Sequence, residues 1–290
     1  MRFALINSGL GLLATASELN KLRPDADLVI AMDPDGMPWG PRTPEDIAGR
    51  SLALARAAAA YEPDVIIVAC NTGTVHALGV LRAEFEPEIP VVGTVPAIKP
   101  AAAAARTVAI WATLATTQST YQRRLIAEFG GGAEVTPVAC PGLATAVDAG
   151  DGDAIAIAIA DAASRTPARC EAVVLGCTEY ELAADLIGSA VPGAILFGTA
   201  TAVAAQALRR TVREPAAVTA PDLSSVGGVS TATLTVLLSG RPGTLPPAAL
   251  RYRQGRELAR LTAGPELTRE IADRDSATDL AANLAADSAS

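Results

Sequence analysis

Two segments of the sequence resemble each other: residues 65–72 read VIIVACNT, and residues 172–179 read AVVLGCTE. Each is a short apolar run typical of strands that are buried on both faces, and each ends in a cysteine followed by small polar residues. The two cysteines, Cys70 and Cys177, lie 107 positions apart (177 minus 70). The pattern predicts a buried strand before each cysteine and a helix after it.

A second pair of segments repeats at nearly the same spacing. Residues 4–8 read ALINS, and residues 109–113 read AIWAT, 105 positions later (113 minus 8). One such match would mean little, because buried strands resemble one another. Two matches at almost one spacing indicate two similar α/β halves, whose corresponding strand ends could face one another across a cleft.

The chain up to Arg213 alternates short apolar runs with longer helix-like stretches, which is typical of parallel α/β proteins. Strands are expected at residues 2–6, 27–31, 65–69, 91–94, 108–111, 134–137, 172–175 and 194–197. Helices are expected at residues 11–22, 44–60, 74–84, 96–105, 119–128, 154–163, 180–187 and 200–210. The predicted fold class is α/β: two similar α/β domains with mostly parallel sheets, and an active site in the cleft between them.

The chain is expected to divide into two α/β domains and a tail. We expect a first α/β domain made of residues 1–97 together with 211–262, and a second α/β domain made of residues 98–210. A further helix is expected over residues 248–261. Residues 263–290 are polar, acidic and rich in Ala and Ser, so we expect them to form a flexible tail.

Composition excludes several classes of protein. Half of the 290 residues are hydrophobic and 19% are charged, so we expect a sizeable core and not global disorder. The formal net charge of −8 argues against direct nucleic-acid binding, which needs a basic face. No apolar stretch reaches the ~18 residues of a membrane helix, and polar residues and glycines at positions 7–11 interrupt a stretch that loosely resembles a secretory leader. We therefore expect a cytoplasmic protein without a membrane segment.

The four cysteines fit neither a disulfide scaffold nor a zinc site. They form no CxxC pair, and His76 is the only histidine. This pattern predicts no metal. Residues 9–11 read GLG and lack the third glycine of a dinucleotide-binding turn, so we expect no cofactor either. His76 is expected to be a packed helix residue, and Cys140, which precedes a proline, a buried turn residue.

The chemistry expected of Cys70 and Cys177 follows from their place after buried strands. Ligands bind at the carboxyl ends of strands in open α/β sheets, where helix N-termini favour a thiolate. A single cysteine in such a place is more often a small buried hydrophobe. Two cysteines at matching positions fit stereoinversion, in which a thiolate removes a proton from a carbon and a thiol on the opposite face delivers another. Reversing the direction requires two chemically similar groups.

Several ordered motifs resemble those of glutamate racemases, which belong to the cofactor-independent aspartate/glutamate racemase superfamily. The resemblance runs from Arg2 to about Arg210, with a weaker echo at residues 233–261. The motifs that carry it are NSG at residues 7–9, MPWGPR at 37–42, ACNT at 69–72, the segment 113–121, CPGL at 140–143 and LGCTEY at 175–180. The family is cytoplasmic and often dimeric, and makes D-glutamate for peptidoglycan synthesis, hence for cell wall biogenesis and cell shape. Its two α/β domains each contribute one catalytic cysteine.

The resemblance implies roles for individual residues. Cys70 and Cys177 resemble the two acid/base thiols, and Asn7 and Glu179 stand where the family places residues that assist them. Positions that surround a small acidic amino acid as substrate are matched by Asn7, Ser8, Trp39, Gly40, Asn71, Thr72, Thr113, Thr116, Thr178 and Glu179. The resemblance also implies a homodimer, no cofactor and no direct contact with nucleic acid or membrane.

Three positions depart from the family pattern. Glutamate racemases usually carry Asp at the position of Asn7, His at that of Glu179 and Tyr at that of Trp39. Asn7 can form hydrogen bonds but cannot take a proton, whereas Glu179 can do both. The Gly-Cys-Thr-Glu sequence at the second cysteine resembles aspartate and hydantoin racemases. The leading prediction is a glutamate racemase, an isomerase. The alternatives are an aspartate or hydantoin racemase or cis–trans isomerase of the superfamily, or a weakened, racemase-like binding or regulatory protein.

Overall fold

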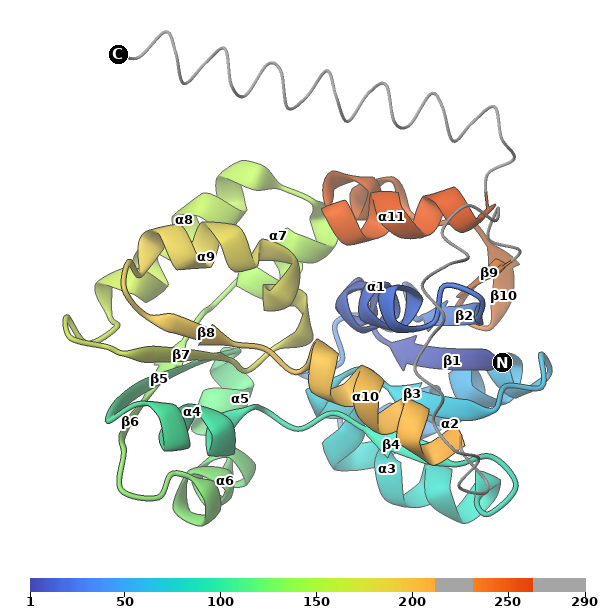
Figure 1. The fold of residues 1–290 in the computed structure, drawn as a ribbon, viewed down its shortest axis with the longest axis horizontal. Helices are drawn as coiled ribbons and strands as arrows, with labels where there is room; N and C mark the ends of the chain where they lie inside the picture. The colour runs from blue at the N-terminus through green and yellow to red at the C-terminus, as the bar shows by residue number, and fades with distance from the viewer. Residues whose placement is uncertain (212–231, 263–290) are drawn as a thin grey trace, which may run out of the picture.

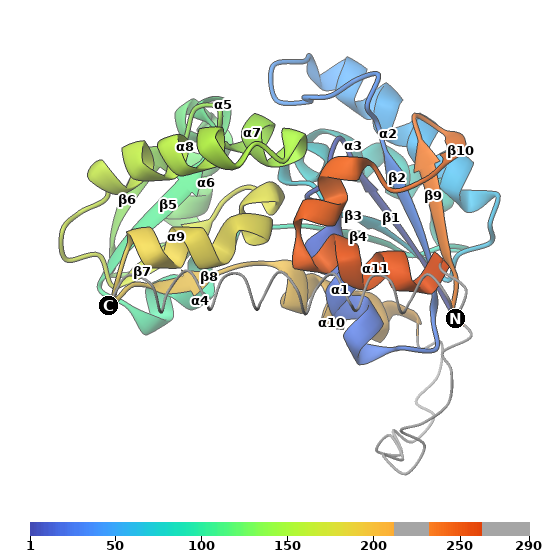
Figure 2. The same cartoon turned by 90° about the horizontal axis from the view of Figure 1, so that it is seen from above.

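The computed structural model describes residues 1–211 and 232–262, which form two lobes that lie side by side (Figures 1 and 2). The strands are β1 (Arg2–Asn7), β2 (Asp27–Met32), β3 (Val65–Val68), β4 (Val91–Gly93), β5 (Thr107–Ala112), β6 (Glu134–Ala139), β7 (Ala172–Leu175), β8 (Ile195–Phe197), β9 (Leu234–Leu238) and β10 (Arg241–Gly243). The first lobe has the sheet β10-β9-β2-β1-β3-β4, and the second has the sheet β6-β5-β7-β8. Only β10 is antiparallel to its neighbour within these described sheets. The predicted α/β class with mostly parallel sheets is confirmed.

The two sheets repeat one strand order. The order β2-β1-β3-β4 in the first lobe matches β6-β5-β7-β8 in the second, element by element along the chain. The repeat seen in the sequence at β1/β5 and β3/β7 therefore extends to whole halves. The eight strands expected before residue 213 are confirmed to within two residues at each end.

Helices cover the faces of both sheets (Figure 2). They are α1 (Leu12–Leu22), α2 (Pro44–Ala59), α3 (Asn71–Phe85), α4 (Ile98–Ala104), α5 (Leu114–Gln118), α6 (Thr120–Phe129), α7 (Leu143–Ala149), α8 (Gly152–Ser164), α9 (Ala184–Ala190), α10 (Ala200–Thr211) and α11 (Arg253–Thr262), with 3₁₀ helices η1 (Thr178–Ala183) and η3 (Pro247–Arg251). Covering both faces makes the central strands apolar on both sides. In β1, Phe3 and Leu5 join one core cluster while Ala4 and Ile6 join the other.

Some predicted helices need correction. The helix expected from residue 74 begins at Asn71, because the side chain of Cys70 caps its first turn. The helix expected over residues 180–187 is a 3₁₀ helix followed by α9, and the one expected over 248–261 is η3 followed by α11. Helices α5 and α7 and strands β9 and β10 were not expected, because segments of three to seven residues are too short to show a periodic pattern.

Helix α10 lies against the first lobe although it directly follows β8 of the second (Figure 1). It contacts α1, β3 and β4. The predicted domain division assigns residues 200–210 to the second domain, whereas these contacts favour a boundary before Ala200. The remainder of that division stays a prediction, and the tail predicted at residues 263–290 lies outside the described residues.

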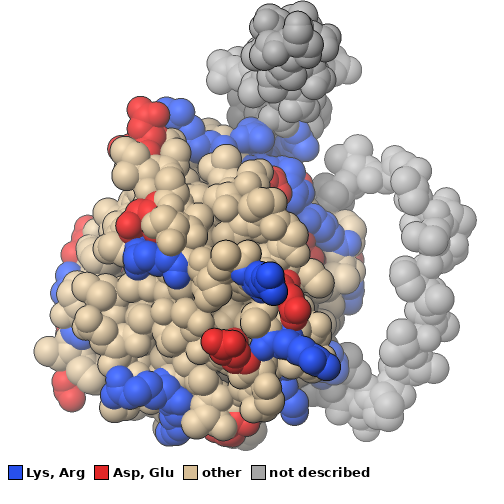
Figure 3. All heavy atoms as spheres, turned by 90° about the vertical axis from the view of Figure 1, so that its left-hand side faces the viewer, with Lys and Arg blue, Asp and Glu red and all other residues tan. Residues whose placement is uncertain are grey.

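On the face of the molecule in Figure 3, acidic and basic side chains lie around a broad uncharged area. Within residues 1–211 and 232–262, none of the helices combines the length and the apolar character needed to cross a membrane.

Candidate active site

A cavity of about 370 Å³ lies where strand ends from both sheets meet. Its lining follows six parallel strands at their carboxyl ends, the usual ligand-binding edge of such sheets. The lining residues are Ser8 after β1, Pro38 to Pro41 after β2, Cys70 and Thr72 after β3, Thr113 to Ala115 after β5, Cys140 to Gly142 with Ala144, Thr145 and Asp148 after β6, and Cys177 and Glu179 after β7. The cavity is therefore built by both lobes. A larger cavity of about 540 Å³, between α11 and η1, holds none of the predicted site residues.

Cys70 lies at the N-terminus of α3. The backbone N–H of Gly73 donates a hydrogen bond to Cys70 Sγ over 3.4 Å. Burial raises the pKa of the Cys70 thiol to about 12, and the negative charge of Glu179 adds to this rise. Backbone N–H groups of Gly73, Thr72 and Ser8 oppose the rise in pKa. The groups next to this sulfur are therefore donors that stabilise a thiolate once it forms.

Cys177 lies just before the 3₁₀ helix η1 and has a carboxylate beside it. Its Sγ donates a hydrogen bond to Glu179 Oε2 over 2.8 Å. Burial raises the pKa of the Cys177 thiol well above its ordinary value, and the charges of Glu179, Cys70 and Asp148 raise it further. Cys70 thus lies close enough to act electrostatically on Cys177. Glu179, which is 5% exposed, is placed to accept the proton of this thiol.

Asp148 is a further titratable group of the cavity, and the sequence analysis missed it. Burial raises the pKa of its carboxyl group to about 8, the charge of Glu179 raises it too, and a hydrogen bond from the backbone N–H of Leu10 opposes this. That N–H lies 2.7 Å from Asp148 Oδ1. Burial and the neighbouring charge therefore favour the protonated form of this carboxyl group. The available signal was an acid within the mostly apolar segment 144–149, which follows the CPGL motif.

Asn7, expected to contact substrate, does not line the cavity. It is fully buried at the end of β1, and its Nδ2 donates to the carbonyl oxygen of Ala69 over 2.8 Å and to Thr178 Oγ1 over 3.2 Å. Its Oδ1 accepts from the backbone N–H of Ser8 over 2.6 Å. Asn7 therefore orients Ser8 and ties the first lobe to Thr178 of the second. A Cβ at Gly11 would overlap Asn7 and Thr178, so only glycine allows this approach.

Asn71 forms a second tie between the lobes. Its Nδ2 donates to the carbonyl oxygen of Gly176 over 2.9 Å, while its buried Oδ1 has no hydrogen-bond partner among the described residues. Asn71 and Thr116 line an adjoining cavity of about 260 Å³ that shares Gly40, Thr72 and Ala115 with the first. Thr113 Oγ1 donates to Thr116 Oγ1 over 3.0 Å, which links the predicted threonines of this loop.

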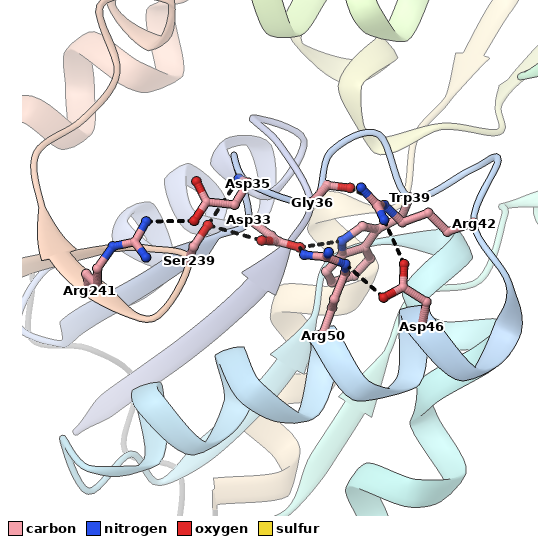
Figure 4. A network of polar contacts seen from close by, with 9 residues as sticks. All are labelled: Asp33, Asp35, Gly36, Trp39, Arg42, Asp46, Arg50, Ser239 and Arg241. Carbon is pink, nitrogen blue, oxygen red and sulfur yellow. Dashed lines mark hydrogen bonds and ion pairs between the residues drawn. The ribbon is translucent and has the colours of Figure 1, made fainter.

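A network of polar contacts fixes the segment after β2 that contributes Trp39 and Gly40 to the cavity lining (Figure 4). Trp39 Nε1 donates to Asp33 Oδ2 over 2.9 Å, and Arg50 pairs with the same oxygen over 3.2 Å. Ser239, in the turn between β9 and β10, donates to Asp33 Oδ1 over 3.1 Å. The network continues through Arg42, Asp46, Asp35 and Arg241.

The indole of Trp39 also packs near the first thiol. A Cβ on Gly73 would lie 3.0 Å from Trp39 Cζ3, so the ring lies against the helical turn that follows Cys70. Because the indole N–H of Trp39 already donates to Asp33, Trp39 presents an apolar ring to the cavity and not a hydrogen-bond donor.

Cys140 and His76 were both expected to have structural roles. Cys140 is buried in a turn, as expected, and also lines the cavity. His76 lies in a helix, as expected, but the prediction that it is packed is wrong, because it is exposed on α3 and lines the adjoining cavity. Within the described part of the chain, no three His, Cys, Asp or Glu side chains are grouped so that they could hold a metal ion. The strand ends thus bring together Ser8, Trp39, Gly40, Cys70, Thr72, Thr113, Cys177 and Glu179 of the predicted set in one cavity.

Known proteins resemble this chain in sequence and in fold. The glutamate racemase of Herpetosiphon aurantiacus is 37% identical over 214 residues, covering 71% of this chain and 82% of that protein. The glutamate racemase of Pseudomonas putida (strain W619) is 33% identical over 211 residues, covering 71% of this chain and 79% of that protein. The structure of Escherichia coli glutamate racemase in complex with L-glutamate and the activator UDP-MurNAc-ala superposes with a TM-score of 0.72 at 26% identity, covering 89% of this chain and 94% of that one.

A sequence model of the Asp/Glu/Hydantoin racemase family matches residues 6–207, which include every residue that lines the cavity. The family expected from the ordered motifs is thereby confirmed. The chain belongs to the Asp/Glu/Hydantoin racemase family.

Proposed function

We propose that this protein interconverts L- and D-glutamate without a cofactor, with Cys70 and Cys177 exchanging the α-proton from opposite faces of the substrate. The observation that carries the proposal is that one thiol from each lobe lines the same cavity. Relatives named glutamate racemases, at 33% and 37% identity, support glutamate as the substrate. On this proposal the product D-glutamate serves peptidoglycan synthesis.

In one direction a Cys70 thiolate forms a bond to the α-proton as the C–H bond breaks. The carbon then takes the proton of the Cys177 thiol on its other face, leaving Cys177 as a thiolate. The reverse direction starts from this state, in which the Cys177 thiolate removes the α-proton and the Cys70 thiol delivers its own. Where the resting protein holds Cys177 as a thiol, Glu179 accepts its proton over the 2.8 Å contact to form that thiolate. For a second turnover in the same direction, one thiol releases a proton to water and the other takes one up, so no redox partner or co-reactant is needed.

The α-proton is far less acidic than a thiol, whose ordinary pKa is about 8.5, so the cavity must lower the energy of the carbanion-like transition state. The lining supplies the hydroxyl groups of Thr72 and Thr145 and the Asp148 carboxyl group, whose raised pKa favours its protonated form. Such fixed donors stabilise negative charge on the substrate carboxylate, and they do so more strongly when substrate expels water from the cavity.

The decisive experiment incubates the purified protein in D2O with L-glutamate and separately with D-glutamate, and follows the products by chiral chromatography and mass spectrometry. We expect each enantiomer to yield the other with deuterium at the α-carbon. Aspartate, hydantoins and a maleate-type cis–trans substrate are run in parallel. If glutamate stays unlabelled and unchanged while another member of the panel reacts, glutamate is the wrong substrate. If nothing reacts, the chain is not a racemase of these compounds.

The proposal includes a homodimer in the cytoplasm. Light scattering coupled to size-exclusion chromatography measures the mass in solution directly. A mass of one chain, 29.4 kDa, at all concentrations tested would contradict the dimer.

A further inference from the structure

Glu181 lies on the same short 3₁₀ helix that begins after Cys177. Helix η1 spans Thr178–Ala183 and carries Glu179, the carboxylate beside the second thiol, two residues before Glu181. Glu181 does not line the cavity of the two thiols, and neither the racemase chemistry nor the motif analysis assigns it a role.

The Glu181 carboxylate is bound to the start of α10. Glu181 Oε1 accepts hydrogen bonds from the backbone N–H and the hydroxyl of Thr199, each over 2.8 Å, and from the backbone N–H of Ala200 over 3.2 Å. A Cβ at Gly198 would lie 2.6 Å from Glu181 Oε2, so the carboxylate lies directly against this backbone. The two N–H groups lie at the N-terminus of α10, one on the residue before the helix and one on its first residue, where the helix offers no internal partners. A carboxylate there is also favoured by the helix dipole.

These contacts lie where the chain passes from the second lobe to the first. Strand β8 ends at Phe197 in the second sheet, and α10 begins at Ala200 and packs on α1, β3 and β4 of the first lobe (Figure 1). Strand β3 is the strand that ends next to Cys70. Glu181 therefore connects the element that directly follows Cys177 to a helix that packs on the strand leading to Cys70.

We propose that Glu181 is a positioning residue that fixes Cys177 relative to Cys70 by fastening η1 to the N-terminus of α10. This inference rests on the proposed two-thiol function. Its expected signature is asymmetric, because loss of Glu181 moves the Cys177 turn and leaves Cys70, at the N-terminus of α3, in place.

The test compares Glu181→Ala, Glu181→Gln and, as a matched control, Glu18→Ala. Glu18 lies on α1 and also meets the first turn of α10, where its Oε2 accepts from Thr201 Oγ1 over 3.2 Å. Its negative charge raises the pKa of Glu181, but it does not donate to or accept from the Glu181 carboxylate, so Glu18→Ala leaves the hydrogen bonds between Glu181 and α10 in place. Each variant is incubated in D2O with each enantiomer of glutamate, and inversion and α-deuterium exchange without inversion are measured separately.

For Glu181→Ala we expect inversion to fall at least about tenfold, since a displacement of about 1 Å in a catalytic group has an effect of this size or larger. One enantiomer should then exchange its α-proton faster than it inverts, because Cys70 still removes that proton, while the other does neither. Glu181→Gln keeps an oxygen acceptor and should stay near wild type, as should Glu18→Ala. A general loosening of the fold would lower exchange and inversion in the same ratio from both enantiomers.

A second readout does not depend on turnover. The rate at which iodoacetamide alkylates Cys177, relative to Cys70, is measured by peptide mass spectrometry in the same variants. We expect Glu181→Ala to change this ratio and Glu18→Ala to leave it unchanged. Thr199→Ala removes one donor to Glu181 and should shift the alkylation ratio in the same direction to a smaller extent. This variant replaces Glu181→Ala in the test if Glu181→Ala does not fold.

Unchanged ratios in both readouts, or the same shift in Glu18→Ala, would overturn the role of Glu181. If wild-type protein fails to invert or exchange glutamate, the proposed function fails, and the alkylation ratio still decides whether Glu181 positions Cys177.

Discussion

The turns after β3 and β7 occupy equivalent places in the two halves, yet they are built differently. After β3, Cys70 leads directly into α3, and its sulfur accepts a hydrogen bond from the backbone N–H of Gly73. After β7, Cys177 leads into a 3₁₀ helix, and its sulfur donates to Glu179. The repeated strands place the two thiols alike, whereas the turns give one of them backbone donors and the other a carboxylate. The duplication thus fixes where the chemistry occurs, and the local turn fixes how each thiol can lose its proton.

The largest expected effect comes from removing either thiol. Cys70→Ser and Cys177→Ser should each lower racemisation by about 10²–10⁴, the usual contribution of a positioned acid or base. The two variants should then differ in which glutamate enantiomer still exchanges its α-proton in D2O, which NMR detects. If both variants retain exchange with the same enantiomer, the thiols do not act on opposite faces.

A smaller effect, confined to one thiol, is expected from Glu179→Gln. The amide can still accept a hydrogen bond from Cys177 but cannot take its proton, so the half-reaction that starts from a Cys177 thiolate should slow by about 10². Pre-steady-state deuterium exchange with each enantiomer separates the two half-reactions. If the exchange rate falls equally for both enantiomers, Glu179 serves the two thiols equally. The proposed functional difference between the turns after β3 and β7 would then be wrong.

Asp148 should make activity and stability depend on pH. Its folded-state pKa of about 8 lies above its ordinary value, so the folded protein holds a proton that the unfolded chain loses. Stability therefore falls by up to about 1.4 kcal/mol per pH unit as the pH rises from about 4 to the folded-state value. Activity should also fall above that pH, because an ionised Asp148 adds negative charge beside Glu179 and the substrate.

The matched variant for this prediction is Asp148→Asn, which keeps an acceptor for the backbone N–H of Leu10. Its melting temperature should exceed that of wild type by more at pH 8 than at pH 5, as measured by differential scanning calorimetry. A difference in melting temperature that does not change with pH would show that the Asp148 pKa is not raised.

The smallest effect is expected from Trp39→Phe. Losing the indole N–H leaves the buried Asp33 carboxylate with one partner fewer and should lower the free energy of unfolding by about 1–3 kcal/mol. The KM for glutamate should rise more than kcat falls, since the ring forms the cavity wall and does not move a proton. Steady-state kinetics and urea unfolding measure the two effects.

Trp111→Phe is the control for that variant. Trp111 Nε1 donates to Thr166 Oγ1 over 2.9 Å, and the residue does not line the cavity. It should lose a comparable amount of stability without a change in KM. If both variants change KM alike, the effect comes from stability and not from the cavity wall.

The strands and the family could be predicted from the sequence because both depend on local patterns. Strands buried on both faces are nearly continuous apolar runs, and the motifs that contain Cys70 and Cys177 stand directly at their ends. Asp148 was missed because its significance depends on burial beside Glu179, a residue 31 positions away (179 minus 148). Asn7 was expected to face the substrate, yet its hydrogen bonds go to Ala69, Ser8 and Thr178.

Apolar periodicity, the repeated strand ends and the motif order establish the α/β class, the duplicated halves and the racemase family, since these features are carried by neighbouring residues. Only the packing of the two lobes places α10 on the first sheet, brings Cys70 and Cys177 to one cavity and buries Asp148 beside it. These arrangements arise from contacts between residues far apart in the chain, and burial, which sets the pKa of a carboxyl or thiol group, exists only once those contacts have formed.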